Sequence, residues 1–122
     1  MEQIIYITDE EREKGRKVID AFAELYELTD VVVLDAGKYG FVKLQYYREQ
    51  QGFEVMSTFT DSEKLFDALW QDWFEEQVWR SVLGTPLEEL EYKESFALLP
   101  KEKQDEILCR KAYFENKKLA SF

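Results

Sequence analysis

Acidic residues surround one tryptophan in the stretch LFDALWQDWFEEQVW, residues 65–79. On a helix with about 100° per residue, Trp79 falls outside the half that holds the other aromatic rings. Its neighbours on that side are the acids Asp72, Glu75 and Glu76. Carboxylates attract a basic surface over a long range, and an aromatic side chain can anchor in that surface at short range. This group is therefore a candidate site for binding another protein.

Three further acids, Glu88, Glu89 and Glu91, follow in the sequence. Residues 61–94 hold ten acids and three bases, so this segment contributes −7 to the net charge of −10. Carboxylates placed where phosphates would lie can occupy the nucleic-acid site of another protein. We expect these acids to extend the partner-binding surface around Trp79.

Most aromatic residues of the stretch have a simpler explanation as core. One half of the expected helix is apolar, and we expect it to pack on the sheet: Leu65, Phe66, Leu69, Trp70, Trp73 and Phe74. Trp79 can also be explained without a binding partner. In that interpretation Val78, Trp79 and Val82 form a second apolar stripe that the C-terminal helices cover. The exposure of Trp79 decides between the two interpretations.

Residues suited to catalysis are few. The chain has no histidine, which removes the commonest general base and the most frequent ligand of transition metals. Its one cysteine, Cys109, is expected to be a structural or incidental thiol, and GKYG at 37–40 lacks the spacing of a phosphate-binding loop. We therefore expect no enzymatic activity, no cofactor and no metal site.

Composition favours a single domain, residues 1–122, because 45% hydrophobic residues suffice for one core. The net charge of −10 opposes direct binding to nucleic acid or to anionic membranes. No apolar run approaches the roughly 20 residues that span a bilayer, and the first residues, MEQIIYITDEE, do not have the pattern of a signal peptide. Together these features predict a cytoplasmic protein.

The first half of the chain predicts strands around one helix. IIYI at 4–7 can form a short strand, and Thr8 with Glu11 forms a capping box that starts a helix to about Leu28. Three β-rich segments separated by turns predict an antiparallel meander: 30–36, 41–47 and 53–59. In the middle segment the apolar residues alternate and share one face: Val42, Leu44 and Tyr46.

The second half predicts helices. One runs from about residue 61 to 83 and ends at Gly84, the second covers 86–94 after the N-cap Thr85, and the last begins at Pro100. The fold class expected from all elements is α+β: a small antiparallel sheet of three to four strands packed against helices, in the order β-α-β-β-β-α-α-α.

Three functions agree with these features. The favoured one is a non-catalytic acidic module that binds the basic surface of a nucleic-acid-handling protein and inhibits it through carboxylates that mimic phosphates. In size, charge and architecture the chain resembles phage and mobile-element counter-defence proteins, anti-CRISPR inhibitors included. The alternatives are an adaptor subunit or homo-oligomer, and a small ligand-binding domain or carboxylate-dependent enzyme.

Overall fold

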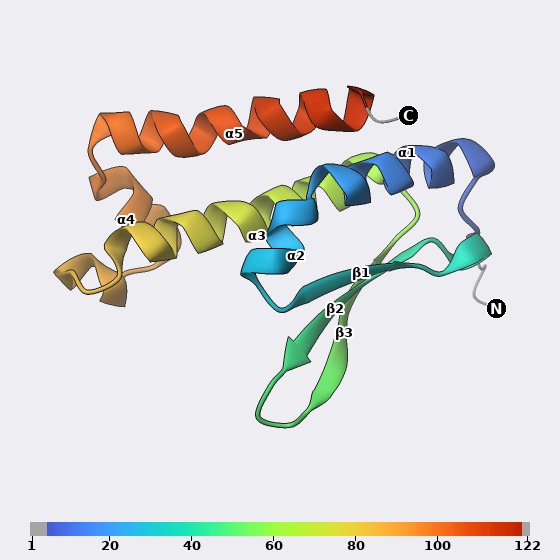
Figure 1. Ribbon diagram of the computed structural model, residues 1–122, viewed down its shortest axis with the longest axis horizontal. Coiled ribbons are helices and arrows are strands. Elements are labelled where there is room, and N and C mark those ends of the chain that lie inside the picture. The colour runs from blue at the N-terminus through green and yellow to red at the C-terminus, as the bar shows by residue number, and fades with distance from the viewer. Residues whose placement is uncertain (1–4, 121–122) are drawn as a thin grey trace.

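The computed structural model describes residues 5–120, with side chains through residue 118 (Figure 1). The elements in chain order are α1 (Asp9–Ala21), α2 (Ala23–Leu28), β1 (Val31–Asp35), the 3₁₀ turn η1 (Gly37–Tyr39), β2 (Phe41–Tyr47), β3 (Gly52–Phe59), α3 (Ser62–Val82), the 3₁₀ turn η2 (Pro86–Glu89), α4 (Tyr92–Leu98) and α5 (Lys101–Ala120). The expected α+β fold with a small antiparallel sheet is confirmed.

The N-terminal helix begins as its capping box predicts, because the Thr8 hydroxyl accepts a hydrogen bond from the Glu11 backbone N–H at 3.2 Å. The expected single helix to Leu28 is wrong: it breaks at Phe22 into α1 and α2. The fully buried Phe22 ring lies 4.4 Å from that of Phe114 and 5.3 Å from that of Phe66. Packing of this ring in the core coincides with the break.

The expected strand at 4–7 is also not formed in its described part, residues 5–7, and Ile4 lies outside the described residues. The Ile7 backbone N–H donates to the Lys38 carbonyl at 3.0 Å, which ties the segment to η1 rather than to a strand. Within the described residues the sheet therefore has three strands, in the antiparallel order β1-β2-β3. Met56 is an extra residue of β3, at the register shift opposite Lys43 and Leu44.

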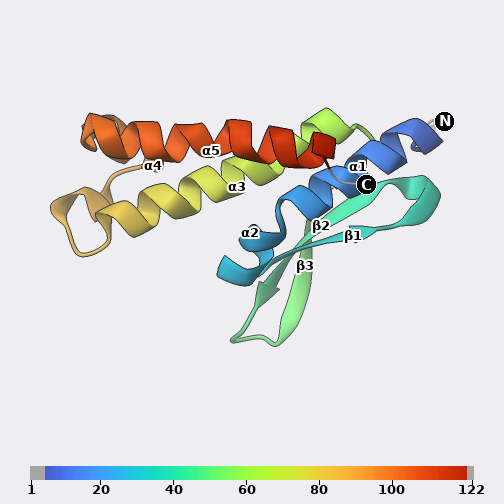
Figure 2. The same cartoon turned by 45° about the horizontal axis from the view of Figure 1, so that its top comes forward.

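All the helices lie on one side of this sheet, and the end of the β2–β3 hairpin projects away from them (Figures 1 and 2). Phe41 points to the helix side, where it is buried in the main hydrophobic cluster. The register places eight residues on the opposite side, which we name the open face: Val32, Leu34, Val42, Leu44, Tyr46, Phe53, Val55 and Thr58.

The main cluster is built mostly between helices. Four residues of the predicted apolar half of α3 are buried there, Leu65, Phe66, Leu69 and Trp73, with Trp70 at the margin, whereas Phe74 packs against a second cluster. The buried residues pack chiefly against α1, α2 and α5, and the sheet contributes Phe41 with Val33 and Phe59 at the margin. The expectation that α3 packs mainly on the sheet is therefore wrong. The long α5 closes the side of α3 that the small sheet cannot cover (Figure 2).

A second, smaller cluster lies at the other end of α3. Its buried members are Val78, Val82, Leu99 and Ile107. The helix expected at 86–94 is instead the turn η2 followed by α4, and the buried Ser95 hydroxyl donates to the Leu87 carbonyl at 2.9 Å. This bond folds α4 back onto η2. Gly84, with φ of +81°, ends α3 in the left-handed conformation that its position predicts.

Candidate functional site

Trp79 is exposed, whereas its apolar neighbours on α3 are not. Its side chain is 49% exposed, against 1% for Val78 and 3% for Val82. The two valines belong to the second cluster, so the C-terminal elements cover them as the stripe interpretation predicts. The same interpretation is wrong for Trp79, which stays accessible to a partner.

Trp79 separates two hollows on the surface. One, of about 460 Å³, lies between the end of α2, the sheet and α3, where Asp72, Glu75 and Glu76 line it with Trp79. The other, of about 310 Å³, lies between α3, η2 and α4, where Glu88 joins Glu75 and Trp79. Glu75 and Trp79 line both, so the structure brings five of the seven predicted residues around one ridge.

Two of these acids have cations of the protein itself as partners. Asp72 Oδ2 lies 2.6 Å from Lys43 Nζ, and both side chains are mostly shielded from water. Glu76 Oε1 lies 2.7 Å from Arg80 Nε, while Nη2 of the same arginine donates to the Leu28 carbonyl at 3.3 Å. Asp72 therefore attaches α3 to the sheet, and Glu76 pairs with the arginine that reaches α2, so both acids contribute little net negative charge at the site.

The remaining acids of the site have no ion pair within the described residues. Glu75 accepts only a long hydrogen bond of 3.4 Å from Gln71, whose amide also donates to the Tyr92 hydroxyl at 2.7 Å. Glu88 accepts from the Gly84 backbone N–H at 3.2 Å, which holds its carboxylate beside the end of α3. These two carboxylates are positioned and retain their charge.

Glu89 and Glu91 are exposed but line neither hollow beside Trp79. The prediction placed Glu88, Glu89 and Glu91 on one helix. In the structure η2 ends at Glu89 and α4 begins at Tyr92, so the three acids do not share one helical face. They add to the charge around the site without facing the ridge. The site formed around Trp79 is therefore smaller than the sequence predicts.

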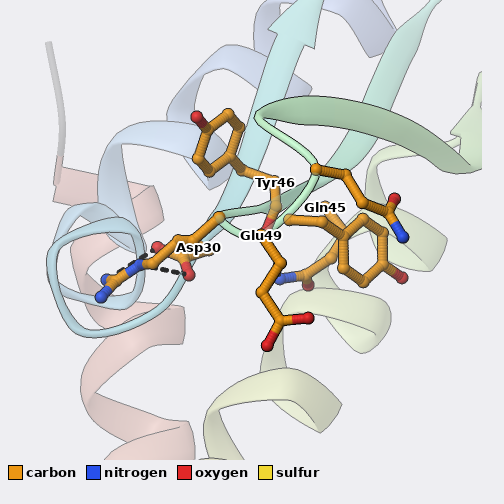
Figure 3. A pocket seen from close by; sticks show the side chains of 7 residues that line it. Asp30, Gln45, Tyr46 and Glu49 are labelled. Atoms are coloured by element: carbon orange, nitrogen blue, oxygen red, sulfur yellow. Dashed lines mark hydrogen bonds and ion pairs between the residues drawn. The ribbon is translucent and has the colours of Figure 1, made fainter.

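A neighbouring hollow of about 390 Å³ adjoins the first one (Figure 3). The two share Asp30 and Gln45, and the Asp30 carboxylate accepts from Nε and Nη2 of Arg48 at 3.0 and 3.1 Å, the contacts dashed in the figure. These residues and Lys43 were not predicted from the sequence. The alternation in β2 was the only signal, and it was misleading, because the polar positions 43 and 45 look like a row that faces solvent.

The part of the chain that the structure describes also bears on metal binding, membrane spanning and thiol chemistry. No three acids, cysteines or histidines there are close enough to hold a metal ion, and no helix there is long and apolar enough to cross a membrane. The exposed Cys109 thiol donates to the Glu106 carbonyl at 3.0 Å, a contact within its own helix. The arrangement around Trp79 can accept hydrogen bonds from cationic side chains and stack on them.

No family model, curated protein or solved structure matches this chain. Function is therefore inferred from the geometry and charge of Trp79, Glu75 and Glu88, on an α3 that the Lys43–Asp72 ion pair holds against the sheet.

Proposed function

We propose that this protein is a non-catalytic, cytoplasmic binding module that uses the ridge at Trp79 to hold a basic surface of a nucleic-acid-handling protein. Its carboxylates take the places of phosphates and so inhibit that partner, as counter-defence proteins of phages and mobile elements do. Nucleic acid and membranes are not its direct ligands, because the net charge of −10 repels both.

The observation that carries this proposal is a half-exposed tryptophan between two hollows, with an unpaired carboxylate on each side. Tryptophan in a protein interface supplies a large contact area and stacks on arginine. Glu75 and Glu88 lie where arginine or lysine side chains of a partner would enter the hollows. A basic nucleic-acid groove presents both kinds of side chain.

Rigidity of the ridge supports the same proposal. The Lys43–Asp72 ion pair holds α3 against the sheet, and Arg80, which pairs with Glu76 on the same helix, donates to the Leu28 carbonyl of α2. The Gln71–Tyr92 hydrogen bond of 2.7 Å connects α3 to α4. A surface whose side chains are already ordered loses less entropy on binding than a flexible one. Asp72 and Glu76 are therefore positioning residues in this proposal.

The test is capture of a partner by tagged protein, compared with two variants of equal charge. The site variant carries Glu75→Lys and Glu88→Lys. The control carries Glu102→Lys and Glu115→Lys, which are exposed on α5 and have no ion pair within the described residues. Both variants change the net charge from −10 to −6, so any difference between them reports the site. Bound proteins are identified by mass spectrometry at low and high salt.

We expect the wild type and the control to retain a nucleic-acid-binding protein at low salt, with release by salt or by added DNA or RNA. The site variant should lose it, and Trp79→Ala should weaken retention in the same way. Equal retention by the site variant would overturn the proposal. So would a retained protein that nucleic acid does not displace.

A further inference from the structure

The two hollows beside Trp79 differ in the negative charge that they offer a partner. We name them the α2 hollow, of about 460 Å³, and the α4 hollow, of about 310 Å³, after the helix that borders each of them besides α3. Three acids of the α2 hollow are each paired with a cation of the protein itself: Asp30 with Arg48, Asp72 with Lys43 and Glu76 with Arg80. Glu88, in the α4 hollow, and Glu75, which lines both, have no ion pair within the described residues. Uncompensated negative charge therefore gathers at the α4 hollow.

The most buried lining of the α4 hollow is apolar. Val78 and Val82 line it and are 1% and 3% exposed, while Leu90 adds a third aliphatic side chain. The buried Ser95 also lines it, but its hydroxyl donates to the Leu87 carbonyl at 2.9 Å, so this donor already has a partner. An aliphatic chain can therefore lie on this floor without leaving a buried donor unpaired.

Charged and aromatic groups border the same hollow nearer to solvent. The Trp79 side chain is half-exposed and Glu88 is exposed. The Glu88 carboxylate accepts from the Gly84 backbone N–H at 3.2 Å, and that of Glu75 accepts from Gln71. Glu75 comes from α3 and Glu88 from η2, so the two carboxylates belong to different elements that line one hollow. A ligand that donates hydrogen bonds in more than one direction can engage both.

We propose that the α4 hollow is a pocket for one arginine side chain of the partner, and that it selects arginine over lysine. This inference deepens the proposed function and rests on it for the identity of the partner. The methylene groups of the arginine lie on the apolar floor, and its guanidinium plane stacks on Trp79. Its N–H groups donate to Glu75 and Glu88. The apolar floor, the aromatic ring and the two charges then all have a counterpart in one ligand side chain.

Lysine fits the same pocket less well. Its ammonium group is a compact and strongly hydrated charge, without a plane to stack on Trp79. The guanidinium group is more weakly hydrated, so the partial loss of water in this hollow costs less for arginine. The partner should therefore place an arginine at the α4 hollow, while the other cations of its surface contribute long-range attraction.

The test is titration of the full chain with the capped tripeptide acetyl-Gly-Arg-Gly-amide, observed by the NMR signal of the Trp79 indole N–H. Comparison of the wild type with Trp79→Phe identifies that signal among those of the three tryptophans. Parallel titrations use the same peptide with lysine, citrulline or norleucine in place of arginine. Citrulline keeps the planar shape without the charge, and norleucine keeps only the aliphatic chain.

We expect the arginine peptide to shift the Trp79 signal to saturation, with a dissociation constant of about 1–10 mM for a single side chain. The lysine peptide should bind about threefold or more weakly. The citrulline and norleucine peptides should bind about tenfold or more weakly, because both lack the charge. Equal binding of the lysine and arginine peptides would overturn the proposal, and so would the absence of any shift.

Matched variants test the two carboxylates themselves. The pocket variant carries Glu75→Gln and Glu88→Gln, and the control carries Glu89→Gln and Glu91→Gln, at residues that line neither hollow. Each variant changes the net charge from −10 to −8, so both lose the same overall charge. The pocket variant should bind the arginine peptide about tenfold or more weakly, and the control should bind it like the wild type. Equal affinities of the two variants, both folded by circular dichroism, would contradict the pocket.

Failure of this inference and failure of the proposed function are distinguishable. Capture of a nucleic-acid-binding partner, together with equal affinity for the two cationic peptides, would overturn the arginine pocket alone. Selective binding of the arginine peptide without capture of such a partner would support the pocket and overturn the inhibitory function.

Discussion

The two faces of the β-sheet carry opposite chemistry. On β2, the helix-covered face holds Phe41, Lys43 and Gln45, whereas the open face holds the apolar Val42 and Leu44. A strand pattern shows which side chains share a face, but it does not show which face the helices cover. In this protein the Phe41 and Phe59 rings and the ion pairs of Lys43 and Asp35 lie on the helix side, and most of the aliphatic surface of the sheet is left outside.

Adjacent residues of β2 give the largest expected contrast between the faces. Phe41 is 1% exposed in the main cluster, so Phe41→Ala should lower the free energy of unfolding by about 3–5 kcal/mol through lost burial and a cavity. Val42→Ala on the open face should cost less than about 1 kcal/mol in the monomer. Urea denaturation at low protein concentration measures both. Similar costs for the two variants would contradict the assignment of the faces.

The contact between α1 and the covered face can be tested next. A methyl group on Gly15 would overlap the Phe41 ring, which is buried and cannot move aside. Gly15→Ala should therefore destabilise by about 1–3 kcal/mol, although alanine favours helix by up to about 1 kcal/mol. In a Phe41→Ala background the same substitution should be neutral or stabilising. Additive costs in urea denaturation would show that the two residues do not meet.

The Lys43–Asp72 ion pair beneath α3 should contribute less to the free energy of unfolding than the Phe41 ring does. Lys43→Met leaves the shielded Asp72 carboxylate without its cation, and we expect a loss of about 1–3 kcal/mol, below that of a fully buried pair. Adding Asp72→Leu should restore most of it, because no charge is then left unpaired. Gln45→Met on the same face is the control and should be nearly neutral. Thermal unfolding of the four proteins tests the pair.

Of the two faces of the sheet, only the covered one carries an acid whose pKa is lowered, so acidification should destabilise the protein through this face, and only weakly. Desolvation tends to raise the pKa of Asp35, but hydrogen bonds from the Gly37 backbone and from Arg16 and Arg12 lower it to about 2. A carboxyl with a lowered pKa in the folded state stabilises above the pKa of the unfolded chain, and this contribution disappears as pH falls from about 4 to 2.

Asp35→Asn isolates this effect from that of the other acids. The loss of stability between pH 7 and pH 3 should be smaller in the variant than in the wild type, by less than about 1 kcal/mol because the pair is partly exposed. Chemical denaturation at the two pH values measures the difference. An identical pH response of both proteins would show that the ion pairs to α1 contribute nothing to stability.

Local signals in the sequence predicted most of the elements. The three strands, the capping box at Thr8 and the left-handed Gly84 depend on neighbouring residues, so the sequence shows them directly. The break at Phe22 and the turn η2 depend on contacts with distant segments, and local patterns predicted continuous helices there.

The candidate site was predictable in part for the same reason. The helical spacing of α3 correctly grouped Trp79 with Glu75 and Glu76. It could not show that Lys43, which is 29 positions away in the sequence, neutralises Asp72. The exposed state of Trp79 likewise depends on how η2 and α4 fold back, which covers Val78 and leaves the tryptophan free.

The division of the hydrophobic interior into two clusters has a dynamic consequence. Helices α3 and α5 run through both, but the second cluster is smaller and closed only by short elements, η2 and α4. Units with fewer buried contacts open at a lower free energy, so backbone amides around Val82 should exchange with solvent faster than those around Leu69. Trp79 lies beside this more labile cluster, so the order of its surroundings depends on the Lys43–Asp72 ion pair and the Gln71–Tyr92 hydrogen bond rather than on a large core.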